Sequence, residues 1–142
     1  MSQPNELYAY FAIKGDFDPD EITRLTGVTP TRVRRKGEVG EYNRAGYPCD
    51  GWYLYSRLEK TRPLEEHISD VITQLAANRT QFIDLSLQHG GVMQLVAYFK
   101  EYYTGLHFDR QLTESLAEYS LDVDFDFYFP DWQRLKEEHG EH

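Results

Sequence analysis

Cysteine is almost absent from this sequence, because Cys49 is its only cysteine and no disulfide can form within the chain. Disulfide frameworks are typical of small secreted proteins, so the scarcity favours a reducing compartment. The N-terminus also lacks the basic and apolar blocks of a signal peptide. We therefore expect a cytoplasmic protein. A catalytic Cys49 is disfavoured, since no base that would activate the thiol is evident nearby.

Long apolar runs and positive charge are also scarce. No run approaches the roughly 20 residues that a helix needs to cross a bilayer, so we expect no membrane association. Lys and Arg number 15 against 24 Asp and Glu, which gives a net charge of −9 and a pI of about 4.9. Such a field repels phosphate backbones and favours cationic partners, so we expect no nucleic acid partner.

Aromatic residues are plentiful by contrast, with 11 Tyr and 8 Phe among 142 residues. A chain of this length can bury enough surface for one self-sufficient core. We expect a single domain over residues 1–142, with an ordered core at about 7–130 and a charged tail over 131–142.

The segment 121–129 has the clearest pattern in the sequence. Apolar residues at odd positions alternate with Asp122, Asp124, Asp126 and Tyr128. Successive side chains of a strand point to opposite faces, so the pattern predicts a strand with one apolar and one acidic side. We expect the apolar side, which includes Phe125 and Phe127, to be covered by helices.

Similar patterns predict the other elements. Alternation indicates strands over 7–14, 51–58 and 92–103, and an extended basic stretch follows Thr29-Pro30-Thr31. Asp18-Pro19 and Asp109 are helix starts, and an apolar stripe predicts a long helix from Pro63 to residue 75. A break at 76–78 and a helical continuation to Gly90-Gly91 follow.

The predicted order is strand, helix, strand, strand, long helix, strand, helix, strand. We therefore expect an α+β fold with a mainly antiparallel sheet and helices packed on one face. The first six elements have the order of a ferredoxin-like arrangement, to which an extra helix and strand are added. The helices are expected on the face that bears Phe11, Trp52, Leu95 and Phe125.

Several short motifs occur here in the order of a known bacterial family. They are Gly27-Val28-Thr29-Pro30-Thr31, the run ending Arg35-Lys36-Gly37, Gly51-Trp52, and Leu121 to Asp126. From Leu7 to Phe129 the chain thus resembles domain of unknown function 4279, although polar Thr26 stands where an apolar residue is expected. The resemblance implies a bacterial α+β domain and carries no reaction, so it assigns no catalytic residue.

The residues themselves favour no catalytic, metal or cofactor site. Side chains two apart on a strand lie nearly 7 Å from each other, too far for Asp122, Asp124 and Asp126 to share one calcium ion. The histidines show no ligand spacing, and no serine lies in a nucleophile elbow.

Tyrosines dominate the side of the strands that is expected to face away from the helices. Tyrosine offers a large contact area with a polar tip and is enriched at interfaces. We therefore predict partner binding through this side, with cross-strand packing under a covering element as the alternative. The predicted partner-binding residues are Tyr8, Tyr10, Tyr53, Tyr55, Tyr98, Asp122 and Asp124.

A second candidate site is the basic run in this acidic chain. Arg34, Arg35 and Lys36 could hold a carboxylate or phosphate, with Trp52 as an aromatic wall. The alternative is a solvated strand edge that resists aggregation. Two functions thus stay open: a non-catalytic protein-binding domain, immunity-like, inhibitor-like or homodimeric, and a small anion-binding module or weak enzyme.

Overall fold

The computed structural model describes residues 4–40, 44–103 and 105–129. The predicted tail 131–142 and part of the loop 38–50 lie outside these residues. The elements are β1 (Glu6–Gly15), α1 (Pro19–Thr26), β2 (Arg32–Arg34), β3 (Asp50–Tyr55), α2 (Leu64–Leu75), the 3-10 turn η1 (Ala76–Asn78), α3 (Arg79–His89), β4 (Val92–Tyr98), α4 (Arg110–Glu118) and β5 (Asp122–Tyr128).

The strands form one sheet in the order β2-β3-β1-β4-β5. β1 lies antiparallel between β3 and β4, and β2 is antiparallel to β3. This is the ferredoxin-like order that the sequence predicted. The additional α4 and β5 extend the sheet through a crossover, which makes β5 parallel to β4.

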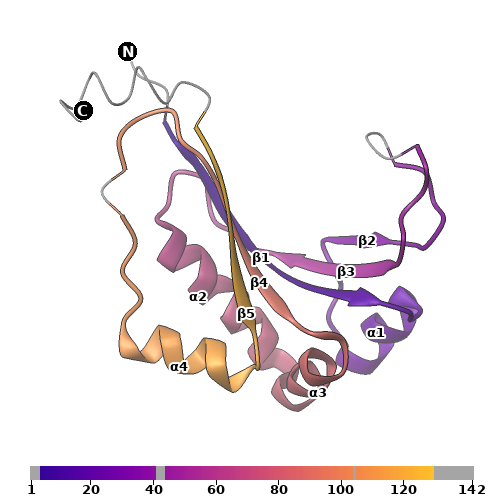
Figure 1. Cartoon of the computed structure of the whole chain (residues 1–142). Helices are drawn as coiled ribbons and strands as arrows, with labels where there is room; N and C mark the ends of the chain where they lie inside the picture. The colour runs from indigo at the N-terminus through magenta and orange to yellow at the C-terminus, as the bar shows by residue number, and fades with distance from the viewer. Residues whose placement is uncertain (1–3, 41–43, 104, 130–142) are drawn as a thin grey trace.

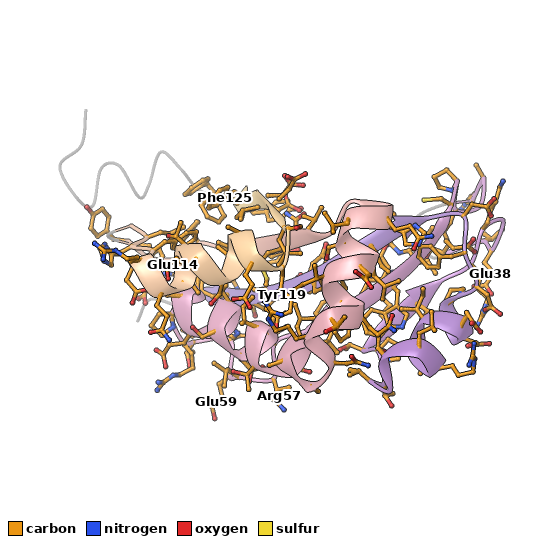
Figure 2. All side chains as sticks on the ribbon, turned by 90° about the horizontal axis from the view of Figure 1, so that it is seen from below. Glu38, Arg57, Glu59, Glu114, Tyr119 and Phe125 are labelled. Carbon is orange, nitrogen blue, oxygen red and sulfur yellow. The ribbon has the colours of Figure 1, made fainter. Side chains whose placement is uncertain are left out.

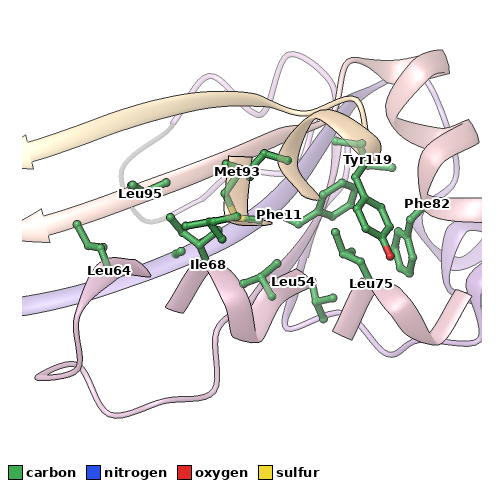
Figure 3. Close-up of a cluster of buried hydrophobic side chains, with 14 of the residues drawn as sticks. Phe11, Leu54, Leu64, Ile68, Leu75, Phe82, Met93, Leu95 and Tyr119 are labelled. Atoms are coloured by element: carbon green, nitrogen blue, oxygen red, sulfur yellow. The ribbon is translucent and has the colours of Figure 1, made fainter. Parts of the chain in front are cut away.

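The helices pack on one face of the twisted sheet, as Figure 1 shows. Their apolar sides meet the sheet residues Phe11, Trp52 and Leu95, each fully buried as predicted. Figure 3 shows how α2 and α3 contribute Ile68 and Phe82 to the same core. This face of the sheet is therefore occupied by the hydrophobic core.

Thr26, the polar residue at an expected apolar position, is accommodated by the end of α1. Its Oγ1 donates to the carbonyl of Ile22 at 2.9 Å and accepts from the backbone N of Val28 at 3.2 Å. Gly27 then ends the helix at φ 70°, a left-handed conformation that favours glycine. The buried hydroxyl is thus satisfied locally.

The predicted break after α2 is a single 3-10 turn. The side-chain amide of Asn78 donates from this turn to the carbonyls of Leu25 and Thr26, at 3.3 and 3.2 Å. These two hydrogen bonds therefore link the end of α1 to the junction of α2 and α3.

Two strands end earlier than the alternation predicted. β3 stops at Tyr55, and Arg57 next donates its backbone N to the Asp70 carboxylate at 2.8 Å. β4 stops at Tyr98, and the backbone N atoms of Lys100 and Glu101 both donate to Asn5 Oδ1, at 2.7 and 2.9 Å. Side-chain oxygens thus accept from these backbone N–H groups in place of a neighbouring strand, and the strand pairing ends there.

The expectation that Phe125 lies buried under helices is wrong. Its side chain is 54% exposed, although it points to the same side as Leu95, its partner on β4. β5 is one of the two outer strands of the sheet, and Phe125 lies at the margin of the helical layer, past α4 (Figure 2). Phe127 is half-buried because it packs edge-on against Phe99, with ring centroids 5.3 Å apart.

Candidate functional site

The second face of the sheet carries the predicted tyrosines. Register shows this directly, because Tyr10 lies opposite Tyr55 on β3 and Gln94 on β4, and Gln94 lies beside Asp124 on β5. No described helix covers this side in Figure 1. We call it the tyrosine face and define it by Tyr8, Tyr10, Tyr53, Tyr55, Tyr98, Tyr128, Asp122, Asp124, Asp126, Arg32 and Arg34.

The phenol rings on this face stack on one another. Tyr10 and Tyr55 have ring centroids 4.5 Å apart and planes within 13°, and Tyr8 stacks on Tyr55 at 5.7 Å. Tyr98 and Tyr128 form a further stack at 4.6 Å. Cross-strand aromatic pairs of this kind stabilise a sheet, and here Tyr98 and Tyr128 are exposed at its surface, whereas Tyr53 is buried at 4% exposure.

Tyr8 and Tyr10 are held in their neutral form. Burial, followed by the neighbouring Tyr55 and Tyr53 hydroxyls, raises the pKa of Tyr10 to about 12. Burial and the adjacent Tyr98 raise the pKa of Tyr8 as well. The face therefore presents hydroxyl groups that both donate and accept hydrogen bonds at neutral pH.

Arginines form one end of the tyrosine face, on β2. The Arg34 guanidinium lies over the Tyr47 and Tyr53 rings, 4.8 and 5.3 Å from their centroids. Burial lowers the pKa of Arg32, but the neighbouring Tyr55 and Tyr47 hydroxyls outweigh it and raise that pKa above its ordinary value. Arg34 Nε is closed to solvent and has no acceptor among the described residues.

Sequence reasoning did not assign Arg32 or Tyr47 to a site. The alternation of Arg32 with Arg34 was the available signal, since residues two apart on a strand share a face. Tyr47 lies in the connection between β2 and β3, where no periodicity indicates a direction.

Aspartates form the opposite end of the face, on β5. Asp122 and Asp124 are exposed, and Asp126 accepts a hydrogen bond from the Tyr128 hydroxyl at 2.8 Å. Within the described ranges, no group of three His, Cys, Asp or Glu side chains could hold a metal ion. The aspartates therefore act here as an acidic rim of the aromatic surface.

A small hollow of about 100 Å³ opens beside the acidic rim. Its lining comes from β1, β4, β5 and the turn after α3, and consists of Tyr10, Ala12, Lys14, His89, Gly90, Val92, Gln94 and Asp124. Charges of both signs and a carboxamide meet in it. The hollow has the size to take the tip of one partner side chain.

The residues of the predicted anion site do not meet. Trp52 lies fully buried on the helical face, where its Nε1 donates to Thr23 Oγ1 at 3.1 Å. Arg35 instead pairs with Asp20 at 2.9 Å, beside the start of α1. Lys36 is exposed, and only Arg34 belongs to the tyrosine face. Successive residues of a strand point to opposite sides, which separates Arg34 from Trp52, the partner of Val33, and Arg35 follows the end of β2.

Comparison with known proteins gives a family and no closer relative. Neither the curated proteins nor the solved structures include a match to this chain. No helix in the described part of the chain is long and apolar enough to cross a membrane. Residues 5–130 match the family model described as a domain of unknown function, DUF4279, and the chain therefore belongs to the DUF4279 family.

Proposed function

We propose that the protein is a non-catalytic cytoplasmic binding domain whose tyrosine face holds a protein partner. The observation that carries the proposal is the division of the sheet into a face packed by helices and a tyrosine-lined face that no described helix covers (Figure 1), although Tyr47 lies against its β2 end and Tyr53 is only 4% exposed. Rigid, neutral phenols give large contact area with little loss of side-chain entropy on binding. Such a surface is suited to a protein partner.

The charges at the two ends of the face favour a second copy of this chain as the partner. β2 with Arg32 and Arg34 and β5 with Asp122 and Asp124 are the outer strands, about 19 Å apart at 4.8 Å per strand. A rotation of 180° about an axis parallel to β1 brings β2 of each copy opposite β5 of the other. Opposite charges then meet at both ends of the interface.

Binding is favoured over catalysis because the closest base and hydroxyl are inaccessible. His67 Nδ1 lies 2.7 Å from Ser56 Oγ, but the His67 side chain is fully buried on the inner side of α2. A substrate on the tyrosine face cannot reach this pair through the sheet. The part of the chain that the structure describes thus offers no hydroxyl–imidazole pair at the accessible surface, which supports a binding role.

The mass of the protein in solution tests the proposal. We expect a dimer at micromolar concentration in light scattering, and a monomer when Tyr10→Asp or Tyr98→Asp places a charge in the interface. Leu87→Asp is the matched control, because Leu87 is 68% exposed on α3, outside the tyrosine face. Dimers that persist in both tyrosine variants would contradict the proposed surface.

Charge exchange tests the second copy itself. Arg32→Glu with Arg34→Glu, or Asp122→Lys with Asp124→Lys, places like charges opposite each other and is expected to dissociate the dimer. An equimolar mixture of these two double variants should form a 1:1 dimer again. A monomeric wild type at 100 µM would overturn the homodimer, and a wild-type monomer that binds a basic protein through Tyr10 would identify that protein class as the partner.

A further inference from the structure

A second recess lies on the helical side of the molecule, between α2 and α4. Its volume is about 270 Å³. These helices lie side by side in Figure 1, and His107 and Asp109, which precede α4, also belong to the lining. We call this recess the helix cleft; it is lined by Glu65, Ser69, Ile72, Thr73, His107, Asp109, Gln111, Leu112 and Ser115.

The spacing of residues on both helices creates the cleft. On α2 the cleft-lining residues recur at i, i+4, i+7 and i+8, so they form a stripe beside the buried stripe that includes Leu64 and Ile68. On α4, Leu112 is buried, whereas Gln111 and Ser115 flank it with polar groups. The cleft thus has apolar residues at its floor and hydroxyl, carboxamide and carboxylate groups around it.

The charged groups of the cleft are mainly acidic. Glu65 and Asp109 line it, and no Lys or Arg is among its described lining residues. Asp109 uses Oδ1 to accept from the backbone N of Leu112 at 2.8 Å, and so caps α4. The cleft therefore has a negative potential in a chain that is already strongly acidic.

Glu65 supplies an independent sign of a missing partner. Its Oε2 accepts from the backbone N of His107 at 3.0 Å, but Oε1 is closed to solvent and has no donor among the described residues. A carboxylate oxygen that is removed from water without a donor destabilises the folded protein. Rotation about the last side-chain torsion, which is broad in glutamate, moves both oxygens together, so a ligand in the cleft takes this carboxylate in exchange for the bond from His107 N.

We propose that the helix cleft binds a small organic cation, a primary amine or guanidinium compound, with Glu65 as its anionic partner. The volume lies just below the range of drug-sized pockets, which limits the ligand to a short molecule. An organic cation fits better than a metal ion, because the described residues offer no group of three metal-ligating side chains. Ser69, Thr73 and Ser115 provide further hydrogen-bonding groups along the cleft.

Titration of the whole protein with agmatine, putrescine and spermidine tests this binding. Calorimetry or amide chemical shifts at 150 mM salt should show saturable binding of at least one of these cations, with the shifted amides on α2 and α4. Citrate, an anion, should not bind there. An absence of saturable binding for all three cations would overturn the proposal.

Variants locate the site. Glu65→Gln should weaken binding about tenfold, as expected for the loss of one charge-assisted hydrogen bond. Glu114→Gln is the matched control, since Glu114 is exposed on α4 and outside the cleft lining (Figure 2). Equal affinities for both variants would overturn the role of Glu65.

A steric variant keeps the test independent of any effect of Glu65 on folding. Ser115→Leu fills the cleft and should abolish binding while circular dichroism and the unfolding temperature show a folded protein. Binding that is unchanged in a folded Ser115→Leu variant would overturn the site. Tyr10→Asp, on the opposite face, should leave cation binding unaltered, so this proposal and the proposed function fail separately.

Discussion

His67 Nδ1 and Ser56 Oγ lie 2.7 Å apart and join α2 to the segment that follows β3. Ser56 Oγ also accepts from the backbone N of Ala9 at 3.2 Å, so the contact reaches the central strand. His67 Nε2 is buried without a partner among the described residues. Burial outweighs the nearby carboxylates and lowers the pKa of His67 below its ordinary 6.5, so the folded protein holds this imidazole in its neutral form.

This histidine predicts a loss of stability in mildly acidic solution. The unfolded chain binds a proton at a pKa of 6.5, whereas the folded chain resists it to lower pH. The free energy of unfolding is therefore highest above pH 6.5 and falls as the pH drops below that value. Urea unfolding between pH 7.5 and 5 measures this slope. His67→Gln should flatten it, and an unchanged slope would contradict the assignment.

Tyr10 predicts a second loss of stability at alkaline pH. Its folded-state pKa of about 12 exceeds the ordinary 10.0, so the folded protein favours the protonated phenol. The contribution is fully present below pH 10 and is lost as the pH rises through 12. Unfolding measured between pH 9 and 11 should show a decline that Tyr10→Phe reduces. A decline of the same size in Tyr10→Phe would refute this origin.

Gly90 and Gly91 are required for different reasons, and substitution should separate them. A Cβ at Gly91 would lie 2.7 Å from Ser86 Cβ and 2.9 Å from Leu121 Cδ2, so Gly91→Ala overpacks the core and should cost roughly 1–3 kcal/mol. Gly90 has open space but a φ of 71°, so Gly90→Ala is strained by its backbone alone. Denaturant unfolding should show partial rescue of Gly91→Ala, but not of Gly90→Ala, by Ser86→Ala.

Phe125 and Phe99 should differ sharply in their contribution to stability. Phe125→Thr removes a ring that is 54% exposed at the sheet edge, so the free energy of unfolding should change by less than about 0.5 kcal/mol. Phe99 is 5% exposed and contacts the Phe127 and Tyr103 rings, so Phe99→Ala should cost roughly 3–5 kcal/mol. Thermal and urea unfolding of both variants provide the comparison. Similar losses would show that Phe125 contributes to the core after all.

Alternation and helix-start residues predicted most of the fold. The two-residue period of the strand patterns predicts Phe11, Trp52 and Leu95 on the side of the sheet that faces the helices, and all three are buried there. Asp18 and Asp109 are predicted at helix starts, and in the structure their carboxylates accept hydrogen bonds from the backbone N of Asp20 and of Leu112. These features depend on neighbours in sequence, so the sequence reveals them directly.

The candidate sites were only partly predictable. The alternation of side chains along each strand placed Tyr8, Tyr10 and Asp124 on one surface. Alternation could not show that the Arg34 guanidinium lies over the rings of Tyr47 and Tyr53. The helix cleft was missed, because Glu65 and Asp109 are far apart in sequence and meet only when α4 packs beside α2.

The order of residues is enough to derive which side of each strand is apolar, where most helices begin, and the acidic character of the chain. Those properties follow from side-chain order and backbone capping, which act over a few residues. The folded arrangement was needed to show that β5 is an outer strand with Phe125 exposed, and that Trp52 and Arg34 lie on opposite faces. Burial depends on which elements pack against a strand, and that packing is set by contacts between distant parts of the chain.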